Sequence, residues 1–225
     1  MPISFANAPL VLSAVKSVCV YCGASPGRNP AFLREATELG ATLARRGLEV
    51  VFGGGRVGLM GAVADAALRG GAPVTGVIPG HLMELEVGHE GVTRLIAVDS
   101  MHERKALMTR LSDACVVLPG GFGTLDEMFE ILSWNQLEVA EKPCGLLNVC
   151  GYFDELLRFL DRMVEERFLL PEHRALLLVD DDRSRLLDAL EAYTPVRVPG
   201  WVTRKIHADP AVWPDAESEA AGERK

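Results

Sequence analysis

Short apolar runs alternate with longer amphipathic segments along most of the chain. The apolar runs predict strands at 17–21, 48–53, 73–79, 93–98, 114–119 and 144–149. The amphipathic segments predict helices at 30–46, 58–70, 101–112, 124–138, 151–166 and 182–193. Strands and helices that alternate in this way are typical of a parallel sheet with helices on both faces. We therefore predict an α/β fold, a doubly wound Rossmann-like parallel sheet, in a single domain.

The two ends of the chain lack this alternation. We expect an N-terminal extension at 1–15, the domain at 16–194, and a proline-rich arm with a disordered polar tail at 195–225. The first residues have neither the basic start nor the continuous apolar core of a secretion signal, and no later run is long and apolar enough to span a membrane. We therefore expect a cytoplasmic protein that does not bind membranes.

Composition and charge narrow the classes of partner. The chain of 225 residues is 48% hydrophobic and carries a formal net charge of −8. Such a balance argues against nucleic acids and anionic membranes as partners, because both select basic surfaces. A small anionic ligand remains compatible, since a few local cations can hold it.

The cysteines do not suggest a disulfide framework or a metal site. Their number is odd, and most lie within apolar, strand-like segments, which favours buried thiols. Cys19 and Cys22 form a C-x-x-C pair, but no second pair completes a zinc site. We predict no metal and no cofactor.

Ligands of doubly wound sheets bind beyond the carboxyl ends of the strands, so the loops there are the candidate site. The loop at 21–27 offers backbone N–H groups and the hydroxyl of Ser25, although a plain turn would look the same. The loop at 52–61 satisfies G-x-G-x-x-G. The next strand, however, ends without the acidic residue that binds a ribose, which disfavours a dinucleotide.

The helix predicted at 101–112 places a cation on its apolar side. Arg104 shares its face with Met101, Leu107, Met108 and Leu111, so it must meet either a core carboxylate or a ligand anion. Lys105 lies near the helix N-terminus, where a cation is disfavoured unless an anion is bound. Ser100 and Glu103 have the spacing of a capping box, which gives Glu103 a structural role.

The segment "PGGFGTLDE" (119–127) combines an anion-type loop with carboxylates. Three glycines permit close backbone approach, and the following helix points its first N–H groups at the same loop. No lysine follows, so this is not a P-loop. Thr124 and Glu127 also have capping-box spacing, which leaves a cap and a catalyst as open alternatives for Glu127.

This segment resembles the P-G-G-x-G-T-x-x-E signature of the LOG family, the cytokinin riboside 5′-monophosphate phosphoribohydrolases, often called lysine-decarboxylase-like proteins. The Arg-Lys pair in "SMHERK" is similar to the family's second signature. Five further segments extend the resemblance over roughly residues 16–180: "VYCGAS", "VFGGGRVGLMGAVADAA", "GVIP", "LSWNQL" and "KPCGLLNVCGYFDELL". The segment "PGHLMELEVGHEGVTRL" is longer than expected for plant members, and its length is similar to that of the bacterial branch.

The resemblance implies hydrolysis of a nucleoside 5′-monophosphate to a free base and ribose 5-phosphate. It implies Glu127 and Arg104 as the catalytic pair, an upstream binding glutamate at either Glu84 or Glu86, and a homodimer or higher homo-oligomer that completes the site. Ser133 stands where plant members often have threonine. The predicted substrate-binding residues are Lys105, Gly120, Gly121, Gly123, Thr124, Ser133, Gly54, Ser25 and Met101.

Two other functions are alternatives to hydrolysis. A nucleotide or cofactor carrier of the same fold, similar to molybdenum-cofactor carrier proteins, would not need Glu127 and Arg104 together. Lysine decarboxylation would need a Schiff-base lysine with supporting partners, and no lysine has that setting in the sequence.

Overall fold

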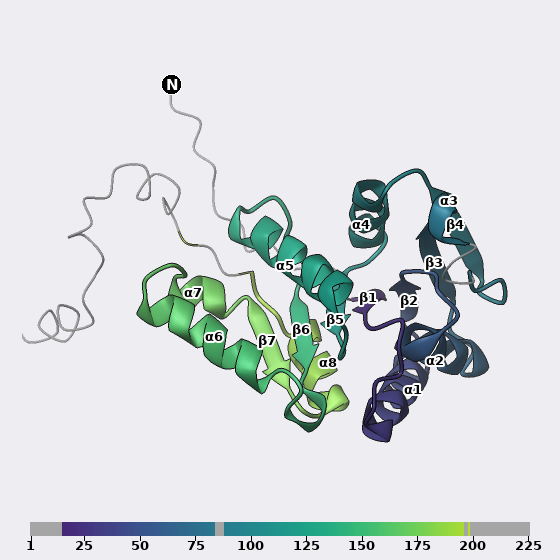
Figure 1. The fold of residues 1–225 in the computed structure, drawn as a ribbon, viewed down its shortest axis with the longest axis horizontal. Coiled ribbons are helices and arrows are strands. Elements are labelled where there is room, and N and C mark those ends of the chain that lie inside the picture. The colour runs from purple at the N-terminus through teal and green to yellow at the C-terminus, as the bar shows by residue number, and fades with distance from the viewer. Residues whose placement is uncertain (1–14, 84–87, 196–197, 199–225) are drawn as a thin grey trace, which may run out of the picture.

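The computed structural model describes residues 15–83, 88–195 and 198, which form one parallel sheet between two layers of helices (Figure 1). The strands run in the order β4-β3-β2-β1-β5-β6-β7, and each pairs in parallel with its neighbours. The strands are β1 (Ser17–Tyr21), β2 (Glu49–Phe52), β3 (Val74–Pro79), β4 (Arg94–Val98), β5 (Ala114–Val117), β6 (Cys144–Leu147) and β7 (Leu177–Asp180). The helices are α1 (Pro30–Arg45), α2 (Gly58–Arg69), α3 (Gly80–Met83), α4 (Met101–Arg110), α5 (Phe122–Gln136), η1 (Val149–Gly151), α6 (Asp154–Glu165), α7 (Pro171–Arg174) and α8 (Arg183–Glu191). The predicted doubly wound α/β fold is confirmed.

Both faces of the sheet are buried, because successive residues of a strand point to opposite sides. In β1, Val18 and Val20 join the core cluster formed with α1, α2 and α8. Cys19 and Tyr21 join the second cluster, formed with α4, α5 and α6. Continuous apolar runs therefore form the central strands, as expected for strands that are covered on both faces.

The structure places the two cysteines of the C-x-x-C pair in the core, as the sequence predicted for buried thiols. Cys19 belongs to the core cluster on one side of the sheet and Cys22 to the cluster on the other side. Both cysteines are buried, and neither forms a disulfide. Within the described ranges, no group of His, Cys, Asp and Glu side chains is arranged to hold a metal ion.

Two kinds of difference separate the predicted and observed elements. β7, α3 and α7 were not predicted, and each has only four residues. α5 begins at Phe122, two residues before its predicted start, and this earlier start changes the interpretation of the Thr124–Glu127 spacing. The predicted extension at 1–15 and the arm and tail at 195–225 lie almost wholly outside the described residues. None of the helices in the described ranges has the length and apolarity that crossing a membrane requires.

A close contact between α1 and α2 gives the first prediction. An added Cβ at Gly40 would lie 2.3 Å from the carbonyl oxygen of Val63, so the two helices pack through this glycine. We expect Gly40→Ala to lower the free energy of unfolding by about 1–3 kcal/mol, the usual cost of overpacking. Urea denaturation of wild type and variant measures this difference in the free energy of unfolding.

The matched control is Gly123→Ala, another helical glycine, around which an added Cβ meets nothing within 4 Å. That variant should keep or raise the stability, because alanine favours a helix over glycine by about 1 kcal/mol. Equal midpoints for the two variants would contradict the proposed packing role of Gly40.

Candidate active site at the carboxyl edge of the sheet

The strand order reverses between β1 and β5, and the loops that follow these two strands are joined to their neighbours by backbone hydrogen bonds. Gly23 N–H donates to the carbonyl of Pro119 at 3.0 Å, and Leu59 N–H donates to the carbonyl of Gly23 at 3.0 Å. Crevices at such reversal points are the usual ligand sites of open α/β sheets. The three glycine-containing loops singled out in the sequence therefore lie at one place in the fold.

The N-terminus of α5 lies at the end of the loop that follows β5. Its N-cap is Gly121, and within the described part of the chain no side chain accepts a hydrogen bond at this cap. The helices α1, α4 and α8 are capped by Asn29, Ser100 and Asp182 instead. The first N–H groups of a helix need acceptors, and an anion can supply them.

The start of α5 excludes one of the two alternatives for Glu127, the capping box. Because Gly121 is the N-cap, Thr124 already lies inside the first turn and cannot be the cap residue of a capping box. The capping-box interpretation of Thr124 and Glu127 is therefore wrong. Thr124 is buried instead. Its hydroxyl oxygen lies 2.0 Å from the position that an added Cβ on Gly120 would occupy.

Glu127 is half-buried near the carboxyl end of β1. Burial raises the pKa of the Cys22 thiol, and the negative charge of Glu127 raises it further. The pKa of Tyr21 is raised mainly by burial, then by Cys115 and Cys19, and the charge of Glu127 makes a smaller contribution. Glu127 thus lies close to the strand at which the loops converge.

Arg104 is only 6% exposed, as its place on the apolar side of the helix predicted. Its Nε donates to the carbonyl of Val77 at 3.1 Å, and its Nη2 donates to the carbonyl of Gly53 at 2.7 Å. An added Cβ at Gly53 would lie 2.0 Å from that Nη2. Gly53 is therefore a glycine because the guanidinium packs directly on its backbone, a role that the G-x-G-x-x-G spacing did not indicate.

Lys105 turns to the other side of α4 and forms ion pairs with α5. Its Nζ lies 2.9 Å from Asp126 and 3.0 Å from Glu130. Burial alone would lower the pKa of this ammonium, but the hydrogen bonds to the two carboxylates outweigh burial and raise the pKa. Lys105 thereby joins α4 to the two turns of α5 that flank Glu127.

The remaining predicted residues are spread more widely. Ser25 is exposed in the loop after β1, where its hydroxyl accepts from Gly27 N–H at 3.3 Å. Gly54 is buried with φ +81°, and Met101 places its sulfur 3.7 Å from a nitrogen of Arg104. Ser133 lies farther along α5, exposed and away from these loops. Glu84 and Glu86 lie outside the described residues.

The predicted Ser100–Glu103 capping box is present in a shifted form. Ser100 accepts from Glu103 N–H at 3.1 Å, and the Glu103 carboxylate accepts from Asp99 N–H at 3.1 Å. Glu103 thus stabilises the first turn of α4, from which Arg104 and Lys105 project.

Several known proteins are similar to this chain in sequence. A family model described as "Possible lysine decarboxylase" matches residues 60–190. A "Probable cytokinin riboside 5′-monophosphate phosphoribohydrolase" of Oryza sativa subsp. japonica is 50% identical over 184 residues, 82% of this chain and 81% of the relative. A "Cytokinin riboside 5′-monophosphate phosphoribohydrolase" of Arabidopsis thaliana is 45% identical over 187 residues, 83% of this chain and 82% of the relative. This chain belongs to the LOG family.

Solved structures with the same fold are more distant from this LOG family member. The molybdenum cofactor binding protein of Rippkaea orientalis aligns with a TM-score of 0.61 at 22% identity, over 78% of this chain and 95% of the other. The molybdenum cofactor carrier protein of Chlamydomonas reinhardtii aligns with a TM-score of 0.59 at 22% identity, over 78% and 96%. At this identity the likeness establishes the fold alone.

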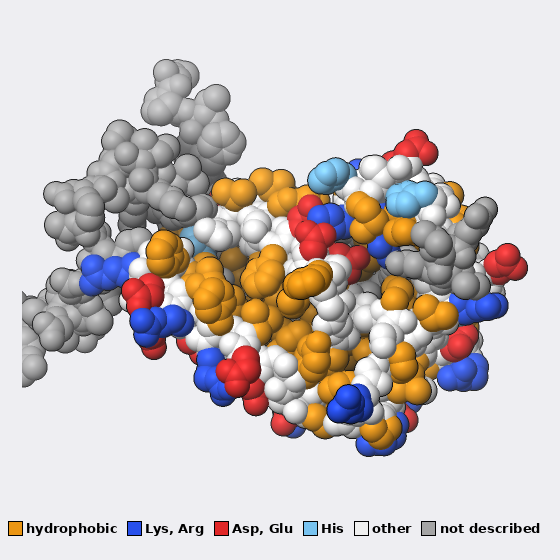
Figure 2. All heavy atoms as spheres, in the orientation of Figure 1, with side chains coloured by type: hydrophobic (Ala, Val, Ile, Leu, Met, Phe, Trp, Pro, Cys, Tyr) orange, Lys and Arg blue, Asp and Glu red, His pale blue; other side chains and the backbone are white. Residues whose placement is uncertain are grey.

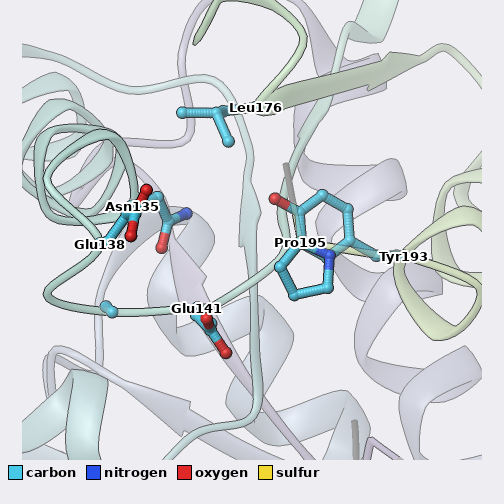
Figure 3. A pocket seen from close by; sticks show the side chains of 7 residues that line it. Asn135, Glu138, Glu141, Leu176, Tyr193 and Pro195 are labelled. Carbon is cyan, nitrogen blue, oxygen red and sulfur yellow. The ribbon is translucent and has the colours of Figure 1, made fainter. Parts of the chain in front are cut away.

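Two hollows of this LOG family member lie at the opposite, amino edge of the sheet. One is lined by residues that include Asn135, Glu141, Leu176, Tyr193 and Pro195 (Figure 3). The amide of Asn135 is held there by the backbone of Lys142, which makes this wall structural. A second hollow of about 690 Å³ lies nearby, between the last turns of α4 and α5. Neither includes any of the predicted site residues.

Sequence reasoning missed several side chains that support the site. Asp126 and Glu130 bind Lys105, and Tyr152 donates its hydroxyl proton to the carbonyl of Gly120 at 2.7 Å. Only the spacing of Asp126 and Glu130, one helical turn apart, could have suggested a shared partner. The contact of Tyr152 joins residues from two different strand ends, and no local pattern encodes it.

The packing of Arg104 on Gly53 generates the second prediction. We expect Gly53→Ala to lower the free energy of unfolding by about 1–3 kcal/mol, because the new methyl group displaces the guanidinium. The φ of Gly53 lies outside the left-handed region, so the guanidinium is the main obstacle to an alanine, with the Met60 sulfur at 3.3 Å as a second close neighbour. In an Arg104→Met background the same change should cost less, giving a coupling energy of about 1 kcal/mol or more in a double-mutant cycle.

Chemical denaturation of the four proteins measures the cycle, with Gly80→Ala as a control, because an added Cβ there meets nothing within 4 Å. Additive effects of Gly53→Ala and Arg104→Met would refute the direct contact.

Proposed function

We propose that this chain hydrolyses the N-glycosidic bond of nucleoside 5′-monophosphates, AMP or N6-modified AMP of the cytokinin type, to a free base and ribose 5-phosphate. Its LOG relatives at 45–50% identity carry the name of this activity. The observation that carries the proposal is a helix N-terminus with no side-chain cap, on the same helix as a half-buried glutamate beside β1. We also propose that the chain is a bacterial-type member and cytoplasmic.

The 5′-phosphate is bound at the start of α5. Backbone N–H groups of Gly121, Gly123 and Thr124 supply donors, and the helix dipole favours the negative charge. An added Cβ at Gly121 or Gly123 meets nothing within 4 Å, which supports an open surface there. Gly120 packs closely against the buried side chain of Thr124, and this contact fixes the shape of the loop.

Glu127 acts on the sugar. As the bond between C1′ and the base nitrogen breaks, its electron pair leaves with the base, and positive charge develops on the ribose ring. The carboxylate stabilises this charge and accepts a proton from the water that attacks C1′. The new C1′–OH bond gives ribose 5-phosphate, and the base is released after it takes up a proton.

Arg104 is the second member of the proposed catalytic pair, with its charge close to the end of β2 and to β3. Lys105, Ser25, Gly54, Met101 and Ser133 remain proposed binding positions. For Lys105 the ion pairs with Asp126 and Glu130 favour an additional role, the placement of α5 against α4.

A carrier without turnover is the second candidate. The fold likeness to molybdenum cofactor proteins favours it, but that likeness stands at 22% identity, against 45–50% for relatives named as hydrolases. Base release from a panel of AMP, GMP, CMP and isopentenyl-AMP separates the two. Binding of nucleotide without release of any base would favour the carrier.

The third prediction concerns Glu127. We expect Glu127→Gln to lower kcat for the best nucleotide by about 100-fold or more, since general acid–base catalysis contributes about 10²–10⁴-fold. Nucleotide binding should persist, because the backbone donors of the phosphate site are unchanged. Base release by chromatography and nucleotide binding by calorimetry measure the two effects.

Glu155→Gln is the control, an exposed glutamate on α6 that accepts a hydrogen bond from Arg158. It should retain wild-type kcat. An active Glu127→Gln enzyme would remove this residue from the mechanism.

We also propose a homo-oligomer. Large apolar side chains remain exposed on α5 and α6 and just beyond them, and Figure 2 shows apolar side chains gathered over this region. They are Phe129, Leu137, Val139, Phe159 and Phe168. Exposed apolar side chains that gather in one region mark an interface between proteins.

The fourth prediction tests this face. We expect sedimentation at micromolar concentration to give at least a dimer, and Leu137→Glu to shift the distribution toward monomer, because a buried unpaired carboxylate is costly. Leu33→Glu on α1 is the control, since Leu33 is also exposed but lies on the other face of the sheet. A monomeric wild type would refute the proposal.

A further inference from the structure

The turn after β6 presents Tyr152 to the loop that follows β5. Tyr152 is 46% exposed, and its hydroxyl donates to the carbonyl of Gly120 at 2.7 Å. This bond joins residues that are 32 positions apart, at the carboxyl ends of two neighbouring strands. The acceptor belongs to the loop proposed to bind the phosphate. Tyr152 lies within the segment "KPCGLLNVCGYFDELL", which supports the family resemblance without assigning a role to this tyrosine.

The turn that carries Tyr152 is held at both ends. Asn148 accepts from Phe153 N–H at 2.9 Å through its side chain and donates from its backbone to the carbonyl of Asp180 at 2.8 Å. Between them, Cys150 and Gly151 both adopt positive φ, 53° and 68°. A turn fixed in this way places the phenol ring with little freedom.

Aromatic contacts fix the ring itself. Tyr152 packs edge-to-face against Phe153 at 4.8 Å and against Phe32 at 5.4 Å between ring centroids. Phe153 is buried in the core, and the Phe32 ring lies against the backbone of Gly27 in the loop after β1. Tyr152 thus connects the turn after β6 with the loops that follow β1 and β5.

The accepted hydrogen bond has a geometric consequence for anion binding. The peptide between Gly120 and Gly121 is planar and trans, so its N–H points opposite to its carbonyl. Fixing the Gly120 carbonyl therefore fixes the direction of the Gly121 N–H, which belongs to the N-cap of α5. A peptide between two glycines is otherwise free to rotate as a unit, because neither residue restricts its dihedral angles.

We infer that Tyr152 is a positioning residue, which holds the Gly120–Gly121 peptide in the orientation that binds the phosphate of the substrate. The inference rests on the proposed function. Such a residue acts equally on the bound substrate and on the transition state, since both carry the phosphate. Its loss therefore raises KM and leaves kcat nearly unchanged.

The experiment compares Tyr152→Phe with wild type. The change removes one hydroxyl and keeps the aromatic packing, so the fold should persist, and thermal melting checks this. We expect KM for AMP, or for the best nucleotide of the panel, to rise about fivefold to tenfold, the value of one hydrogen bond. The inhibition constant of ribose 5-phosphate should rise by the same factor, while that of the free base stays constant.

Tyr193→Phe is the matched control, the same change in a tyrosine at the amino edge of the sheet (Figure 3). It should leave both constants at wild-type values. Unchanged KM and unchanged ribose 5-phosphate inhibition in Tyr152→Phe would overturn the inference. A fall in kcat with equal weakening of ribose 5-phosphate and free base would also overturn it, because it would indicate general damage.

The experiment gives a different result if the proposed function itself is wrong. In that case wild type releases no base from any nucleotide of the panel. Direct calorimetric binding of ribose 5-phosphate to wild type and Tyr152→Phe then tests the positioning role alone. Weaker binding to the variant supports it, and equal binding or absence of binding to both proteins overturns it.

Discussion

The pairing of β1 with both β2 and β5 is the constraint on which the rest of the arrangement depends. The chain builds the sheet outward from β1 through β2, β3 and β4, and then returns to place β5 on the other side. The chain continues to opposite faces of the sheet after these two strands, to α1 after β1 and to α5 after β5. The hydrogen bond from Gly23 to Pro119 extends the β1–β5 contact beyond the strands and holds together the loops that follow them. The start of α5, the turn that carries Tyr152 and the loop after β2 are all placed relative to that pair.

Two consecutive cations on α4 show how burial forces charges into defined partnerships. A guanidinium or ammonium that leaves water must recover its hydrogen bonds inside the protein. Arg104 recovers part of them from the carbonyl of Gly53, just after β2, and from that of Val77 within β3, which ties α4 to the sheet. Lys105 recovers its bonds from two carboxylates of α5, which ties α4 to the helix that carries Glu127. Arg104 and Lys105 thereby fix α4 to the sheet and to the neighbouring helix α5. Gly53 has no side chain, which leaves room for the guanidinium of Arg104.

The elements that the sequence predicts well are those with long, repeated patterns. The central strands and the long helices were placed within a few residues, because their apolar positions repeat with the period of a strand or a helix. β7 has only four residues, and its burial depends on β6 and α8, so its own pattern is too short to identify it. The start of α5 was misplaced because Gly121 caps it without a side chain, and the nearby Thr-x-x-Glu spacing imitated a cap.

The sequence by itself determined the parallel α/β class, the burial of Arg104 and the presence of glycine loops at one edge of the sheet. These follow from periodicity and from the rule that parallel strands end on the same side. Only the tertiary structure decided that Glu127 is no capping residue, that Lys105 binds Asp126 and Glu130, and that Tyr152 reaches the carbonyl of Gly120. Each of these contacts joins different elements or depends on where a helix begins. Local patterns specify faces and spacings, and partners across elements are specified only once the chain has folded.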